Sequence, residues 1–69
     1  MSSNVYKITE VTGSSPTSQE DAIRNAIKRT AKTVQELQWF EVTESRGYIE
    51  NGDVAYWQVT VKIGFTMKD

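Results

Sequence analysis

Trp39 and Phe40 are two large aromatic residues that stand side by side, directly after a helix-like segment and at the start of a strand-like one. Because successive residues of a strand point to opposite faces of a sheet, only one of these side chains can enter a given core. The other side chain needs a different partner. An indole is poorly suited to open solvent, and its flat surface can pack on a second subunit or on a planar ligand.

The residue types that the chain lacks exclude most small-enzyme chemistry. There is no Cys and no His, which excludes disulfides, Cys/His zinc sites, thiol catalysis and any His-based triad. We therefore expect neither catalytic residues nor a metal site. The formal net charge is −1, with acidic and basic residues interleaved, so neither nucleic acid nor a membrane is expected as a partner.

The length predicts one domain that needs added stabilisation. A chain of 69 residues buries only about 60% of its unfolded surface, and oligomerisation is a common way to stabilise such a domain. No apolar run approaches the ~20 residues of a membrane span, and Met1 to Asn4 lack the apolar core of an export signal. These features favour a cytoplasmic protein.

A strand, a helix and a hairpin are the elements that must position the aromatic residues. Residues 5–11 are rich in β-branched residues and are followed by Gly, Ser and Pro, which predicts a strand that ends in a loop. From Ser18 to Leu37 apolar residues recur at three- and four-residue spacing, which predicts an amphipathic helix capped by Ser18 or Thr17. The buried stripe comprises Ala22, Ile23, Ala26, Ile27, Thr30, Val34 and Leu37.

Asn51-Gly52 is the preferred centre of a two-residue type I′ turn and lies between two strand-like runs. The hairpin register that follows from this turn has two faces. One face pairs Phe40 with Ile63, Val42 with Val61, Glu44 with Val59 and Arg46 with Trp57. The other pairs Trp39 with Gly64, Glu41 with Lys62, Thr43 with Thr60 and Ser45 with Gln58.

These elements predict an α+β fold of β-α-β-β order, in which a three-stranded antiparallel sheet wraps around one helix. The predicted core sets Ile23, Ile27, Val34 and Leu37 against Phe40, Val42, Val59, Val61, Ile63 and Phe65. Strands of roughly 13 residues reach ~43 Å, whereas a helix of about 20 residues covers ~30 Å, so strand ends overhang the helix. Trp39 falls on the face away from the helix and is left without a partner.

Several short segments in order resemble the dodecin family. They are Val5-Tyr6-Lys7, Gly13-Ser14-Ser15, Ala22-Ile23-Arg24-Asn25-Ala26, Trp39-Phe40-Glu41-Val42, Arg46-Gly47 and the run from Gln58 to Phe65. Dodecins are flavin-binding proteins in which twelve identical β-α-β-β subunits form a hollow shell, with flavins stacked between symmetry-related tryptophans. The resemblance implies that residues 1–69 form a single flavin-binding domain within a homododecamer.

The resemblance assigns three cofactor-binding residues. Trp39 matches the stacking tryptophan of the family, and Gln58 matches a glutamine whose amide can meet the pyrimidine edge of the flavin. Arg46 matches an arginine near the flavin, where its cationic fork could contact the ligand or a phosphate tail. The ideal hairpin register sets Arg46 on the opposite face from Trp39, so either a bulge near Gly47 redirects it or it acts in a neighbouring subunit.

The chain departs from the family at Thr66, where many bacterial members carry an arginine, and the tail from Met67 to Asp69 offers no obvious substitute. Trp57, Tyr48 and Tyr56 are assigned to packing. The helix residues Lys28, Arg29 and Lys32 are predicted to form a solvent-exposed face of the helix.

The function that the resemblance implies is non-catalytic binding, storage or sequestration of a flavin, with photoprotection. FMN is the expected flavin, riboflavin and FAD are alternatives, and coenzyme A is a candidate second ligand. Two other functions stay open: an oligomeric structural module without cofactor, and a flavoenzyme. The flavoenzyme is disfavoured because the proposed site has no evident general base and little room for a substrate.

Overall fold

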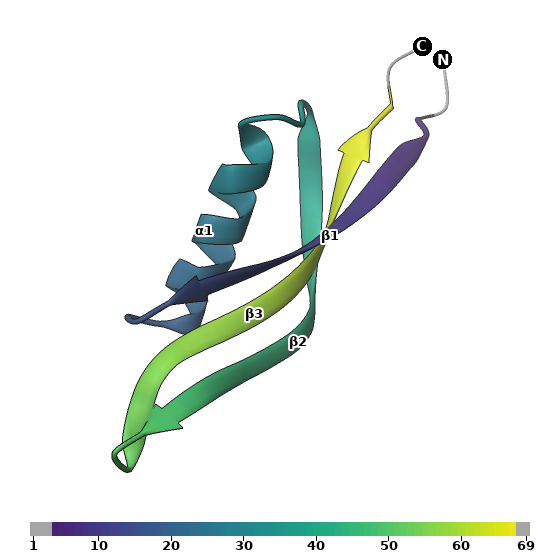
Figure 1. Ribbon diagram of the computed structural model, residues 1–69. Helices are drawn as coiled ribbons and strands as arrows, with labels where there is room; N and C mark the ends of the chain where they lie inside the picture. Colours follow the sequence, from purple (N-terminus) through teal and green to yellow (C-terminus); the bar gives the residue numbers. More distant parts are fainter. Residues whose placement is uncertain (1–3, 68–69) are drawn as a thin grey trace.

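The computed structural model describes residues 4–67 and has the element order β-α-β-β (Figure 1). Strand β1 spans Tyr6–Ser15, helix α1 spans Gln19–Ala31, strand β2 spans Leu37–Glu50 and strand β3 spans Asp53–Thr66. The three strands form one antiparallel sheet in the order β1-β3-β2. The predicted fold class is confirmed. Residues 1–3 and 68–69 lie outside the described residues. The expectations for Met1 to Asn4 and for Met67 to Asp69 rest partly on them.

The core lies between α1 and the middle of β3. Val59, Val61 and Ile63 are at most 1% exposed and meet the small helix residues Ala22 and Ala26. The small side chains let the helix approach the sheet closely, and it packs chiefly on β1 and β3. Ile23, Ile27, Val11, Leu37 and Trp57 surround this centre as partly buried residues.

The helix is shorter than the sequence predicted. Ser18 caps it as expected, because its side chain accepts a hydrogen bond from the Asp21 N–H at 3.0 Å. The helix ends at Ala31 rather than Leu37, and the chain turns toward β2 through Glu36, whose φ of 65° is left-handed. The apolar periodicity continues through Val34 and Leu37 because these partly buried residues still face inward after the helix has ended.

Strand β1 is longer than predicted, since it continues through Gly13 to Ser15 instead of ending in a loop there. Gly13 pairs with Val59 and Ser15 pairs with Trp57 on the neighbouring strand. Ser15 is 2% exposed, and its hydroxyl donates a hydrogen bond of 2.6 Å to Asp21 at the start of the helix. The Gly-Ser-Ser sequence therefore joins the strand to the helix cap.

The predicted turn is confirmed. Asn51 and Gly52 have φ values of 54° and 75°, the left-handed pair that a type I′ turn requires. Glu50 faces Asp53 directly across it. At the far end of the hairpin Trp39 faces Gly64, and Phe40, Glu41 and Val42 also have their predicted partners.

Between these two ends the hairpin carries two compensating bulges. Ala55 on β3 and Thr43 on β2 have no directly facing residue, so the register shifts by one and then shifts back. The predicted partners of residues 44–46 are therefore wrong. Arg46 faces Gln58 instead of Trp57. The β2 side chains from Glu44 to Tyr48 therefore exchange faces relative to the prediction, whereas Gln58 and its neighbours on β3 keep their predicted faces.

One subunit leaves much of its apolar surface uncovered. Its extents are 56 × 20 × 13 Å and its radius of gyration is 14.4 Å, compared with about 11 Å for a compact domain of this length. The hairpin projects well past the helix (Figure 1). Phe40 and Val42 are 48% and 44% exposed, so the prediction that they enter the core is wrong within a single subunit, because α1 does not cover β2.

Candidate functional site

The sheet face opposite the helix carries the candidate site, and Trp39 lies near one end of it. Its indole covers Gly64 on β3, where an added Cβ would come within 2.1 Å of the ring atom Cε2. Gly64 is buried beneath the ring, while Trp39 itself remains 40% exposed. Trp39 lies on the sheet face away from the helix, as the sequence predicted.

The two bulges bring Arg46 and Gln58 directly opposite each other on the same face as Trp39. This removes the conflict that the ideal register created for Arg46. The register shifts at Thr43 and again between Tyr48 and Ile49, where Ala55 is unpaired, so one of the two irregularities lies near Gly47 as one of the two predicted explanations required. Trp39, Arg46 and Gln58 therefore share one sheet surface, although the two strand regions that carry them are far apart.

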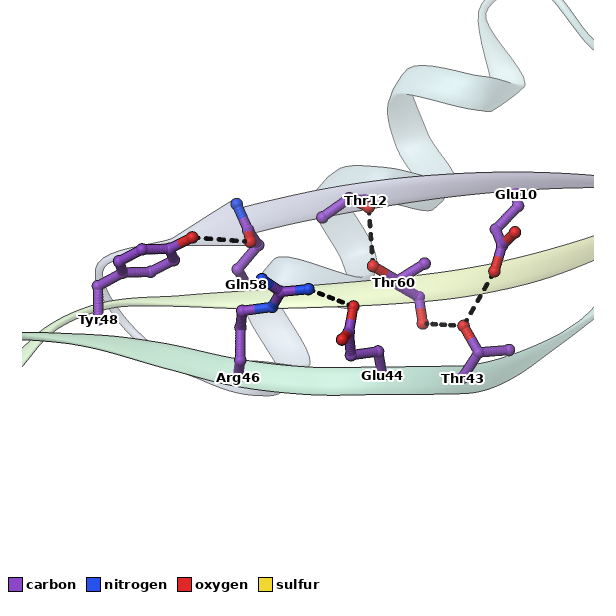
Figure 2. Close-up of polar contacts among 8 residues, drawn as sticks. All are labelled: Glu10, Thr12, Thr43, Glu44, Arg46, Tyr48, Gln58 and Thr60. Atoms are coloured by element: carbon purple, nitrogen blue, oxygen red, sulfur yellow. Dashed lines mark hydrogen bonds and ion pairs between the residues drawn. The ribbon is translucent and has the colours of Figure 1, made fainter.

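Arg46 is held by a carboxylate on its own strand. Its guanidinium forms a charge-assisted hydrogen bond with Glu44 (Figure 2). This bond, more than the Coulomb attraction, raises the pKa of Arg46 above its ordinary value, and a smaller contribution comes from Tyr48. Arg46 therefore remains a cation wherever the protein is folded near neutral pH. Both side chains are about half exposed, at 49% and 53%, so a ligand can reach them.

Tyr48 and Tyr56 extend the site toward the hairpin tip. Their rings stack with centroids 4.7 Å apart and an interplanar angle of 16°. The Tyr48 hydroxyl donates a long hydrogen bond of 3.5 Å to Gln58 Oε1, as Figure 2 shows. Packing is the role that the sequence predicts for both tyrosines. No residue type in the sequence signals this placement, because the bulge that sets the face of Tyr48 is not marked by any distinctive residue.

The stretch between Gln58 and Trp39 is polar. Thr12 and Thr60 are hydrogen-bonded at 2.8 Å. The hydroxyl of the bulged Thr43 lies 3.2 Å from both Glu10 Oε2 and the Thr60 carbonyl oxygen, and it can donate its single proton to either of them (Figure 2). The predicted Thr43–Thr60 pairing is replaced by Glu44 facing Thr60, yet the Thr43 hydroxyl still reaches the Thr60 backbone. These contacts tie all three strands together along the site.

The described residues, 4–67, form no enclosed ligand pocket at Trp39. The cavity beside it, between Ile27, Leu37 and Phe40 among others, holds about 140 Å³, below the ~300 Å³ at which ligand pockets usually begin. A larger hollow of about 870 Å³ lies elsewhere, between β1 and α1. The indole of Trp39 therefore lies on an open surface rather than in an enclosed pocket.

Distance along the sheet adds a second constraint. Trp39 faces position 64 of β3 and Arg46 faces position 58, which sets the two ends of the site about 20 Å apart at about 3.3 Å per residue. One tricyclic ring cannot touch both ends of the same subunit.

Residues 4–67 contain no cluster of three or more acidic, His or Cys side chains arranged to hold a metal ion. Within the same range no helix is long and apolar enough to cross a membrane.

Comparisons with known proteins identify the family. The family model described as Dodecin matches residues 5–68. A Thermus thermophilus protein named Dodecin is 42% identical over 65 residues, which covers 94% of each chain. A Mycobacterium tuberculosis protein named Calcium dodecin is 26% identical and covers 94% of this chain and 92% of its own.

Solved structures show the same subunit fold. The dodecin of Streptomyces coelicolor is 49% identical, covers 100% of this chain and 99% of its own, and superposes with a TM-score of 0.93. The dodecin of Streptomyces davaonensis is 44% identical over 99% of this chain and 100% of its own, again with a TM-score of 0.93. By sequence and by structure, this chain belongs to the dodecin family.

Proposed function

We propose that this protein binds and stores a flavin without catalysing its chemistry, and that it thereby sequesters the flavin and limits photochemistry. The observation that carries the proposal is the Trp39 indole, which lies over buried Gly64 yet stays 40% exposed on a face with Gln58 and Arg46. A flavin ring is planar and electron-poor, and an indole is the most electron-rich aromatic side chain for offset stacking. Family membership supports the choice of ligand.

The three site residues have separate roles in this proposal. Trp39 supplies the stacking surface. Gln58 supplies amide groups that can pair with the alternating carbonyl and N–H edge of the ring. Arg46 supplies a cation near the ligand, and any of the three flavins, FMN, riboflavin or FAD, would present the same ring to Trp39.

The assembly is proposed to be a closed homododecamer. Phe40 and Val42 are exposed on the uncovered side of β2, and Ile8 on β1, which pairs with Gly64, is 51% exposed. A chain of this size with such bare surfaces needs neighbours to be stable. Light scattering at micromolar concentration tests this, and a fully stable monomer or dimer would contradict it.

A fluorescence titration tests flavin binding directly. Stacking on Trp39 is expected to quench flavin emission, and Trp39→Ala should weaken binding by ~1–3 kcal/mol per stacked ring, about ten- to two-hundredfold. The matched control is Trp57→Phe, which changes the partly buried tryptophan that packs toward the helix and should leave quenching unchanged. An intact Trp39→Ala oligomer that binds with unaltered affinity and quenching would refute the assignment.

The absence of catalysis is tested by adding a reduced nicotinamide cofactor to the flavin-loaded protein. The described face offers no His or Cys, and a ring covered by aromatic groups leaves little room for a second substrate. Oxidation of the cofactor should not exceed that caused by the same amount of free flavin. Clear protein-dependent turnover would support the flavoenzyme alternative.

The structural alternative, an oligomer without cofactor, predicts a colourless protein. Chromatography of the small molecules released from denatured native material distinguishes the two, because a flavin binder should release flavin in proportion to its subunits.

Coenzyme A is retained as a proposed second ligand because one hollow has suitable charge. The 870 Å³ hollow between β1 and α1 is lined by Lys28, Arg29 and Lys32 together with the polar residues Ser14 and Asn25. Cations favour phosphate groups. Equilibrium dialysis with coenzyme A, comparing wild type with Lys28→Gln, tests this. Equal binding by both proteins, or none by either, would rule out this hollow as the site.

A further inference from the structure

The tip of the β2-β3 hairpin is exposed on both of its faces. Strand β1 ends opposite Trp57, so beyond that position the hairpin has only two strands, and it projects past the helix (Figure 1). Ile49 faces Val54, and these two side chains are 79% and 45% exposed. Glu50 faces Asp53 on the other face of the hairpin, because successive strand residues alternate. The tip is therefore a two-stranded wedge with one apolar face and one acidic face.

The hollow between β1 and α1 has the complementary chemistry. Its volume of about 870 Å³ lies in the range that holds a drug-sized ligand, so it has room for several side chains of a partner. The helix lines it with three cations, Lys28, Arg29 and Lys32, and β1 lines it with residues 11–14, which have short side chains or none. No carboxylate is among the described residues that line this hollow.

The charges of the tip and of the hollow are not paired within one subunit. Within residues 4–67 the three cations form no ion pair, and the same is true of the two tip carboxylates. The β1 residues of the hollow pair with residues 58–61 of β3, whereas the turn is centred on residues 51 and 52. The turn thus lies about 20 Å farther along the strands at about 3.3 Å per residue. The tip of a subunit therefore does not reach its own hollow.

We propose that the hairpin tip of one subunit docks in the β1-α1 hollow of a second copy of this chain. Glu50 and Asp53 meet the cations of α1, while Ile49 and Val54 pack on the β1 wall. Each subunit supplies one tip and one hollow, so copies of this chain can fill every hollow. The proposal rests on the closed homo-oligomer proposed above and names one of the contacts that closes it.

The geometry of this contact is head-to-tail, because the tip and the hollow are different surfaces. Such contacts form a ring when the rotation between neighbouring subunits closes. The contact buries apolar tip residues that are otherwise exposed to water, and the opposite charges fix the orientation of the tip. Coenzyme A would compete with the tip for the same cations.

A charge exchange tests the contact. Glu50→Lys places a cation against the cations of the hollow, so the protein concentration at which half of the oligomer dissociates should rise about fivefold or more, as measured by light scattering. Adding Lys28→Glu to that variant restores an opposite-charge pair and should recover most of the loss. Lys7→Glu is the matched control, because Lys7 is an exposed lysine outside the hollow, and adding it should recover nothing.

Disulfide cross-linking gives a second measurement that does not depend on charge. The chain has no cysteine, so Ile49→Cys combined with Ser14→Cys introduces the only two thiols. After mild oxidation, this double variant should run as covalently linked chains on a non-reducing denaturing gel. Each single variant should stay unlinked, because a head-to-tail contact brings the tip to the hollow and not to another tip.

The results separate this contact from the assembly as a whole. Recovery that is specific to Lys28→Glu, or linkage that is specific to the cysteine pair, would support the contact. An intact oligomer with neither recovery nor linkage would overturn the proposal, leave the closed assembly standing and leave the hollow to coenzyme A. A wild-type chain that stays monomeric would refute the assembly and this contact together.

Discussion

The indole of Trp39 lies directly over Gly64 of the neighbouring strand, so closely that a Cβ at position 64 would come within 2.1 to 2.6 Å of three ring atoms. Gly64 therefore lets the indole lie close against the sheet, in the position that the proposed flavin stacking uses. Gly64→Ala should push the ring away from the sheet and weaken flavin quenching while the fold is retained. Gly47→Ala is the matched control, because a Cβ there has only ordinary contacts of 3.5 Å or more. Unchanged quenching in Gly64→Ala would show that the position of the indole does not matter.

Gln58 should contribute less than Trp39. Replacing it by Ala removes hydrogen bonds that water can partly replace, so the expected loss of flavin affinity is about 0.5–1.5 kcal/mol, with quenching of the bound flavin largely intact. Tyr48→Phe removes only the long 3.5 Å bond to Gln58 Oε1 and should cost less than Gln58→Ala. Both are measured by fluorescence titration, and a larger effect of Tyr48→Phe would mean that Tyr48 contacts the ligand itself.

Phe40 should be essential for assembly. It is 48% exposed in one subunit and lies on the side of β2 that the helix leaves bare, so a neighbour must cover it if the shell forms. Phe40→Asp is expected to dissociate the oligomer, as measured by light scattering, because a buried unpaired carboxylate is strongly unfavourable. Phe40→Leu keeps an apolar side chain and should assemble. An intact oligomer of Phe40→Asp would place the interface elsewhere.

Gly13 should be required for the seating of the helix. A Cβ at this position would come within 2.2 Å of the Ala22 carbonyl oxygen and 2.9 Å of the Ala26 Cβ. Gly13→Ala therefore forces α1 away from β1 and should destabilise the protein by about 1–3 kcal/mol, the usual cost of overpacking. The neighbouring exposed residue allows Ser14→Ala as a control. Equal denaturation midpoints for wild type and Gly13→Ala would show that the helix can shift without cost.

Local rules were enough to predict the order of the elements, the Ser18 cap and the turn. Each depends on a few adjacent residues: a side-chain oxygen at the helix start, or two residues that tolerate positive φ. The face of Trp39 was also predictable from the turn. The two bulges lie one on each strand and cancel, so the simple register holds again by the time it reaches Trp39.

Contacts between elements decided where the helix ends and how far β1 extends. The helix end at Ala31 and the continuation of β1 to Ser15 depend on contacts between elements, including the buried bond from Ser15 to Asp21. A run of apolar spacing cannot show where the backbone leaves the helix if the side chains continue to face the core.

The tertiary structure likewise decided which residues share the site face. Thr43 and Ala55 are ordinary strand residues, and nothing in their types indicates that each would be left unpaired. Because side chains alternate with a period of two, the unpaired Thr43 moves the β2 side chains that follow it to the other face relative to Trp39. The sequence by itself thus determined which residue types the site could use, with Trp39 on the outer face. Only the folded sheet, through those two bulges, brought Arg46, Glu44 and Tyr48 onto that face beside Gln58.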